Sequence, residues 1–85
     1  MAEMIQRYAE KIEGPSGASY DVFVYGEQRP DGKWEGWLEF HSADARVLRT
    51  ARETTQPNRE ALAYWASGLE PLYFEGAFAR AREVR

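Results

Sequence analysis

Hydrophobic and polar residues alternate most regularly in two stretches, residues 20–28 and 33–42. Both stretches are rich in aromatic and β-branched side chains, which favour β-strands. Between them lies Pro30-Asp31-Gly32. Proline presets φ for the first corner, aspartate accepts local hydrogen bonds, and glycine adopts the left-handed conformation that closes a three-residue loop. The pattern therefore predicts an antiparallel β-hairpin.

This loop pairs Arg29 with Lys33 and thereby fixes the register of the two strands, which sorts their side chains by face. One face is apolar and is expected to be the core: Tyr20, Val22, Val24, Trp34, Leu38 and Phe40. The other face carries three aromatic rings among polar residues: Phe23, Tyr25 and Trp37, with Asp21, Glu27, Glu35, Glu39 and His41.

The segment before the hairpin is open to two interpretations. Residues 14–17, Gly-Pro-Ser-Gly, interrupt any regular element and mark a boundary. Apolar residues before this boundary recur at helical spacing, at Met4 or Ile5, Tyr8 and Ile12. The same segment would alternate as a strand through Tyr8, Glu10 and Ile12. We favour a short N-terminal helix over residues 1–13 and keep the strand as the alternative.

The second half of the chain predicts one further strand and two helices. Residues 46–50 follow a Ser-Ala-Asp-Ala turn and extend the hairpin to a two- or three-stranded antiparallel meander over residues 20–50. Pro57 suits a first helical turn, and helical spacing of apolar residues predicts a helix over residues 57–67. A second helix is predicted over residues 71–83.

A length of 85 residues allows one small domain and excludes a second. We therefore expect a single α+β domain in which an N-terminal segment (1–17) precedes the meander (20–50), and a helical part (57–83) packs against it. The absence of cysteine and the single histidine disfavour disulfides and zinc sites. No apolar stretch is long enough for a membrane span or signal peptide, so we expect a cytoplasmic protein without membrane attachment.

The net charge of −3 is unevenly distributed, because residues 1–45 carry four basic and nine acidic side chains and residues 46–85 carry seven and five. The basic candidates for nucleic-acid or anion binding are Arg46, Arg49, Arg52 and Arg59. Glu53 and Glu60 interrupt this set, which disfavours a nucleic-acid partner. Binding through these arginines is the alternative function.

A polar segment between the predicted third strand and the first helix is a second candidate site. Backbone N–H groups at a helix start could bind an anion, with side chains from Arg52, Thr54, Thr55, Asn58 and Arg59. The same residues could instead only cap the helix and form a turn. The chain has no glycine-rich phosphate loop, no paired carboxylates at helical spacing and no metal-ligand repeat. We therefore expect neither enzymatic activity nor a cofactor or metal.

The three rings Phe23, Tyr25 and Trp37 would form an exposed apolar patch unless something covers them. The cover could be the N-terminal segment or last helix of the same chain, a second copy or another protein, or stacked nucleic-acid bases. Glu27, Glu35 and Glu39 would repel phosphates, which disfavours the bases. Aromatic rings within a polar rim are typical of a protein interface. The sequence thus predicts an interaction module, as a homodimer or accessory subunit.

Two motifs carry a family resemblance: Trp-x-Gly-Trp-Leu-x-Phe at residues 34–40 and Arg-Glu-Thr-Thr-Gln-Pro at residues 52–57. With these motifs the chain resembles a small bacterial family of uncharacterised proteins over residues 20–82. The resemblance implies a compact bacterial domain and transfers no catalytic residue. The order of strands before helices is also similar to that of antitoxin-like and double-stranded-RNA-binding-like domains, without their diagnostic motifs.

Overall fold

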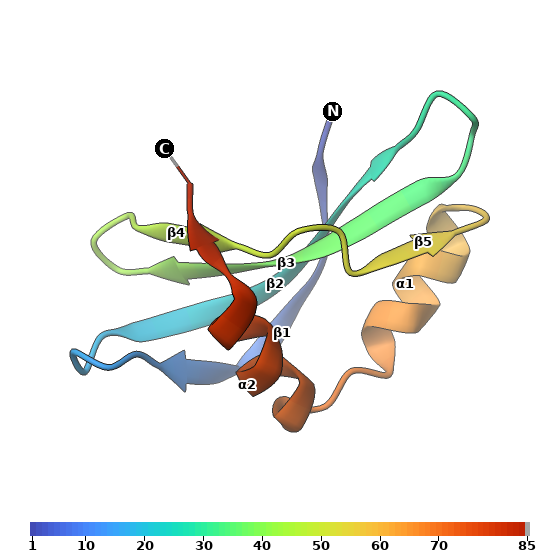
Figure 1. Cartoon of the computed structure of the whole chain (residues 1–85). Helices are drawn as coiled ribbons and strands as arrows, with labels where there is room; N and C mark the ends of the chain where they lie inside the picture. The colour runs from blue at the N-terminus through green and yellow to red at the C-terminus, as the bar shows by residue number, and fades with distance from the viewer. Residues whose placement is uncertain (85) are drawn as a thin grey trace.

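The computed structural model of the chain describes residues 1–84. In chain order its elements are β1 (Glu3–Glu13), β2 (Ser19–Gln28), β3 (Trp34–Ser42), β4 (Val47–Arg49), β5 (Thr54–Gln56), α1 (Arg59–Ser67), α2 (Pro71–Arg80) and β6 (Arg82–Glu83). The strands form one antiparallel sheet in the order β1-β2-β3-β4-β6, and β5 pairs with β3 beside β4 (Figure 1). The α+β class is confirmed, with more strands than predicted.

The predicted hairpin forms β2 and β3 in the predicted register. Val24 lies opposite Leu38, and Tyr25 lies opposite Trp37. In the loop, an Asp31 carboxylate oxygen accepts a hydrogen bond from the Lys33 backbone N–H at 3.0 Å. Gly32 has a φ of 88°, the left-handed conformation that the sequence assigned to it. The turn and the alternation of side chains therefore select the same pairing.

The N-terminal segment is the strand β1, so the preferred helix was wrong. Two irregularities interrupt its pairing with β2, between Met4 and Gln6 and between Arg7 and Lys11. A bulge inserts an extra residue and so shifts the alternation of side chains. Ile5, Tyr8 and Ile12 therefore reach the same face, although a regular strand would not place Ile5 and Tyr8 together. Their spacing imitated that of a helix.

The segment that links β4 to β5 continues along the same edge of β3. The Thr50 backbone N–H donates to the Leu38 carbonyl at 3.0 Å, and Gly36 pairs with Thr54. Three residues, 51–53, therefore lie opposite the single residue Trp37. This bulge separates β4 from β5 and gives its side chains directions that a regular strand would not allow.

Both predicted helices are present with shorter bounds. Asn58 caps α1, where its side-chain oxygen accepts from the Ala61 N–H at 2.8 Å. Helix α2 ends at Arg80 rather than at residue 83, because Ala81 is extended and the next two residues pair with β4 as β6. In residues 1–84 no helix is long and apolar enough to cross a membrane.

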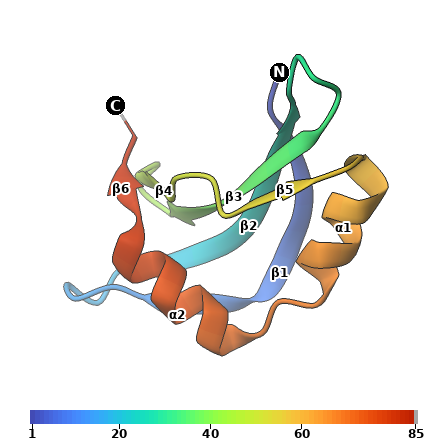
Figure 2. The ribbon, with the colours of Figure 1, turned by 45° about the vertical axis from the view of Figure 1, so that its right-hand side comes forward.

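The core lies between one face of the sheet and both helices, as the turned view shows (Figure 2). The predicted core face is confirmed for Tyr20, which is buried, and for Val22, Val24, Leu38 and Phe40, which are fully buried, whereas Trp34 is only partly buried. Leu62 of α1 fills the space above Gly26 and Gly36, where a Cβ atom would lie 2.4 and 2.6 Å from its methyl groups. On the α2 side, Tyr8 packs against Phe74 and donates its hydroxyl to the Ala66 carbonyl at 2.6 Å. Both helices therefore occupy the same face and leave the other face without a helix.

Candidate interaction face

We call the second face of the sheet the open face, because neither helix covers it. Strands β2 and β3 place at its centre the rings predicted from the sequence, Phe23, Tyr25 and Trp37. The neighbouring strands extend this face on both sides, with Met4, Arg7 and Lys11 from β1 and with Val47 and Arg49 from β4. The polar residues between the rings are Asp21, Glu27, Glu35, Glu39 and His41.

The open face shelters two of its three rings with its own side chains. Phe23 and Trp37 are 8% and 7% exposed, and Tyr25 is half-buried. The guanidinium carbon of Arg7 lies 5.5 Å from the Phe23 ring centre, and that of Arg49 lies 5.5 Å from the Trp37 ring centre. Such contacts combine apolar packing with cation–π attraction. The intramolecular cover is thus made by arginines of adjacent strands, rather than by a segment lying across the face.

A buried carboxylate, Glu39, holds the centre of the open face together. One of its oxygens accepts from the Trp37 indole N–H at 2.8 Å and from the Arg49 Nε–H at 3.1 Å. Its other oxygen lies 2.9 Å from Nε2 of His41, which donates to it. Because Glu39 is only 5% exposed, these charge-assisted bonds act in a low dielectric and fix the positions of three side chains.

His41 extends this cluster towards β2. Its ring stacks on Tyr25 at 6.0 Å between centres and lies 4.6 Å from Phe23. Glu39 and His41 were predicted to share this face, but their hydrogen bond was not predicted. The signal was present in the order Trp37, Glu39, His41, since every second residue of a strand shares a face.

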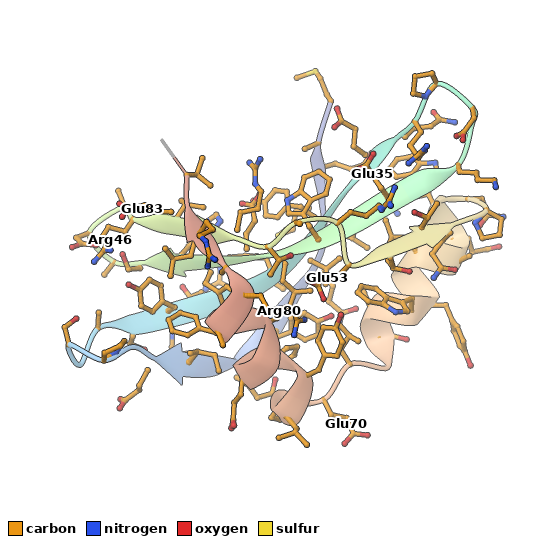
Figure 3. All side chains as sticks on the ribbon, viewed as in Figure 1. Glu35, Arg46, Glu53, Glu70, Arg80 and Glu83 are labelled. Carbon is orange, nitrogen blue, oxygen red and sulfur yellow. The ribbon has the colours of Figure 1, made fainter. Side chains whose placement is uncertain are left out.

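An open pocket of about 240 Å³ lies beside Trp37 on this face. Its lining residues are Glu27, Glu35, Trp37, Arg49, Thr50 and Arg52. Arg52 belongs to the bulge opposite Trp37, which explains how it reaches the pocket. Within residues 1–84, neither Glu35 nor Arg52 has an ion-pair partner, whereas Glu27 binds the amino group of Met1 at 3.0 Å. Glu35 projects from the sheet on the side away from the helices (Figure 3).

The four arginines proposed for nucleic-acid or anion binding do not form one basic surface. Arg46 pairs with Glu83 at 3.3 Å, Arg59 pairs with Glu3 at 2.7 Å, and Arg49 pairs with Glu39. Only Arg49 and Arg52 line the same pocket, where two glutamates accompany them. Most of this positive charge is therefore balanced within the chain.

Most residues of the candidate anion site serve separate structural roles. Asn58 caps α1 and Arg59 is turned to Glu3 of β1. The Thr54 hydroxyl accepts from the Gln56 side chain at 2.7 Å, and Thr55 lies opposite Glu35 in the sheet. Arg52 alone of the five points into the pocket. The start of α1 thus uses these residues for capping and pairing.

Glu53, the other charged residue of the bulge, ties the sheet to α2 instead. Its carboxylate accepts from the Tyr73 hydroxyl at 2.5 Å and from Arg80 at 2.6 Å, and Figure 3 shows Glu53 and Arg80 close together. Partial burial favours the protonated acid, but the bonds from Arg80 and Tyr73 outweigh it and lower the pKa of Glu53. Burial and the bond to Glu53 raise the pKa of Tyr73 to about 12.

Scans against protein-family models, curated proteins and solved structures found no match to this chain. The resemblance to a small bacterial family therefore stays a prediction. No group of three or more histidine, cysteine or acidic residues in the described part of the chain has an arrangement that could hold a metal ion.

Proposed function

We propose that this chain is a non-enzymatic protein-interaction module that binds a second copy of itself through the open face. The observation that carries the proposal is the rigid cluster around Glu39, which presents aromatic and arginine side chains on a sheet face that no helix covers.

The composition of the open face supports a protein partner. Tyrosine, tryptophan, phenylalanine, methionine and arginine are enriched at interfaces, and these residue types make up much of this face. The bonds to Glu39 hold Trp37, His41 and Arg49 in place before any partner arrives. Binding then immobilises few side chains, which lowers its entropic cost.

The distribution of charge favours a second copy as that partner. Glu27 and Glu35 lie at the end of the face next to the β2–β3 turn, whereas Arg7 and Arg49 flank its centre. A two-fold axis at the row of Tyr25 and Trp37, with the strands of the two copies antiparallel, would place the acidic end of each copy over the row of the other that holds Arg7 and Arg49. A two-fold axis produces this reciprocal arrangement, and opposite charges would then face each other.

The size of the molecule is sufficient for such a contact. Its two longer dimensions, 40 and 27 Å, bound a face of roughly 1,000 Å², and a standard interface uses about 800 Å² per partner. The rings that the single chain shelters only with arginines would become the centre of that interface.

Sedimentation equilibrium, with the protein at one to a hundred micromolar, tests the proposal directly. We expect wild type to dimerise and Tyr25→Glu to remain monomeric, because this change places a charge at the centre of the contact. Tyr64→Glu is the matched control, since Tyr64 is 82% exposed on α1. Circular dichroism of each variant checks that it is folded.

Two results would contradict the proposal. A wild type that stays monomeric at a hundred micromolar removes self-association. The second result is that Tyr64→Glu disrupts the dimer while a folded Tyr25→Glu variant still dimerises. This would place the contact on the helices instead.

A further inference from the structure

The pocket beside Trp37 holds two opposite charges that have no ion-pair partner within residues 1–84. Among residues 1–84, Glu35 and Arg52 have no ion-pair partner, although both line this pocket. Glu35 also lies directly opposite Glu27 in the β2–β3 pairing. Like charges in that position destabilise a sheet. The amino group of Met1 offsets part of this repulsion at Glu27, and a cation bound at Glu35 would relieve the rest.

The other wall of the pocket is suited to a carboxylate. Arg49 uses its Nε–H for Glu39, so its terminal nitrogens keep donors for a further acceptor. Arg52 contributes a second guanidinium from the bulge, and such groups bind carboxylates through paired parallel hydrogen bonds. Trp37 is the aromatic residue of the lining.

We propose that this pocket binds a small zwitterion, with its cationic group at Glu35 and its carboxylate between Arg49 and Arg52. A volume of about 240 Å³ is below the range of about 300 to 1,000 Å³ for drug-sized ligands, and therefore suits a molecule the size of an amino acid. The acidic wall excludes nucleotides by repulsion of their phosphates. This inference goes beyond self-association and does not require it, but a second copy packed on the open face would cover the same pocket.

The nearest experimental probe is γ-guanidinobutyrate, which joins one guanidinium to one carboxylate through a short aliphatic chain. Butylguanidinium lacks the carboxylate and butyrate lacks the cation, so the three compounds separate the two halves of the site. Binding is read from ¹H–¹⁵N spectra, through the Trp37 indole N–H and the backbone amides of Glu35 and Arg52. We expect the zwitterion to bind about tenfold more tightly than either half.

Variants of the two unpaired residues assign each wall. Arg52→Gln should weaken the zwitterion about tenfold and leave butylguanidinium unchanged. Glu35→Gln should weaken the zwitterion similarly and leave butyrate unchanged. Glu75→Gln is the control, because Glu75 is exposed on α2, on the other side of the sheet.

Three outcomes would overturn the inference. The first is that millimolar γ-guanidinobutyrate shifts neither the Trp37 indole signal nor the backbone amide signals of Glu35 and Arg52. The second is that γ-guanidinobutyrate, butylguanidinium and butyrate bind with equal affinity. The third is that Arg52→Gln and Glu75→Gln change the affinity for γ-guanidinobutyrate equally. Sedimentation of the wild type without ligand reports self-association alone, and because a second copy on the open face would cover the pocket, a bound zwitterion should lower the dimer fraction. Failure of the pocket and failure of self-association are therefore distinguishable.

Discussion

The contact between Leu62 and the paired glycines decides which face of the sheet carries α1, and Gly36→Ala tests it. A Cβ atom at this position would lie 2.6 Å from one Leu62 methyl carbon and 3.3 Å from the Thr54 methyl carbon. Ordinary carbon contacts are about 3.5 to 4.0 Å, so the first overlap is close to 1 Å. Leu62 is fully buried, so it cannot move into solvent to relieve this overlap.

We expect Gly36→Ala to lower the free energy of unfolding by about 1 to 2 kcal/mol. Overpacking of a core costs about 1 to 3 kcal/mol. Alanine also lowers the conformational entropy of the unfolded chain, which stabilises the folded state by about 0.4 to 1 kcal/mol and offsets part of that cost. Because a small domain is stable by only about 5 to 15 kcal/mol, the effect is large enough to measure.

A double-mutant cycle with Leu62→Val isolates the contact. Valine lacks the two Cδ methyls that meet the added Cβ, and its own cost is about 1 kcal/mol. In the valine background Gly36→Ala should be neutral or slightly stabilising. Urea unfolding followed by tryptophan fluorescence gives all four free energies. If Gly36→Ala costs the same in both backgrounds, the clash with Leu62 is not its cause and the assigned packing of α1 is wrong.

Two further predictions concern the buried polar groups. Glu39→Leu leaves the Trp37 indole N–H and His41 Nε2 without their acceptor, and should lower the free energy of unfolding in urea by about 3 kcal/mol. Glu39→Gln keeps one acceptor and should lower it by about 1 to 2 kcal/mol. A leucine variant as stable as wild type would refute the role of Glu39. The pKa of Tyr73 is raised from 10.0 to about 12 in the folded protein, so its stabilising contribution is complete below pH 10 and is lost as the pH rises towards 12. The stability of Tyr73→Phe relative to wild type should therefore rise across that window, and a constant difference would contradict the assignment.

The hairpin was predictable because two independent local signals agreed on it. The turn residues at Pro30–Gly32 fixed the pairing, and the alternation of side chains required the same register. The positions of both helices followed from apolar spacing, and Pro71 begins α2, whereas Pro57 lies before the Asn58 cap of α1 and not in its first turn. These features depend on residues that are near each other in the sequence.

The parts that were missed depend on pairing between distant segments. Bulges in β1 gave its apolar residues a helical spacing, so the sequence pattern favoured the wrong element. Thr54 and Thr55 were assigned to a segment that caps the helix, forms a turn or binds an anion, but they pair with β3 as β5. The short strand β6 forms only because β4 offers a free edge. Propensity over two or three residues cannot indicate such strands.

The sequence predicted the three aromatic residues of the candidate site, but not the side chains that cover them or the pocket beside them. Phe23, Tyr25 and Trp37 share the predicted face, yet the arginines that cover two of them come from the strands on either side. The bulge places the side chain of Arg52 at the pocket and the side chain of the next residue, Glu53, at α2. These two neighbouring side chains therefore point in opposite directions. Nothing in the local pattern specifies that division.

The most direct test of the open face as a self-association surface is a dilution series of ¹H–¹⁵N spectra on the wild-type protein. We predict that the Trp37 indole signal moves with protein concentration while that of Trp65, which packs between the helices, stays fixed. Signals of both residues that are unchanged from ten micromolar to one millimolar would contradict the account.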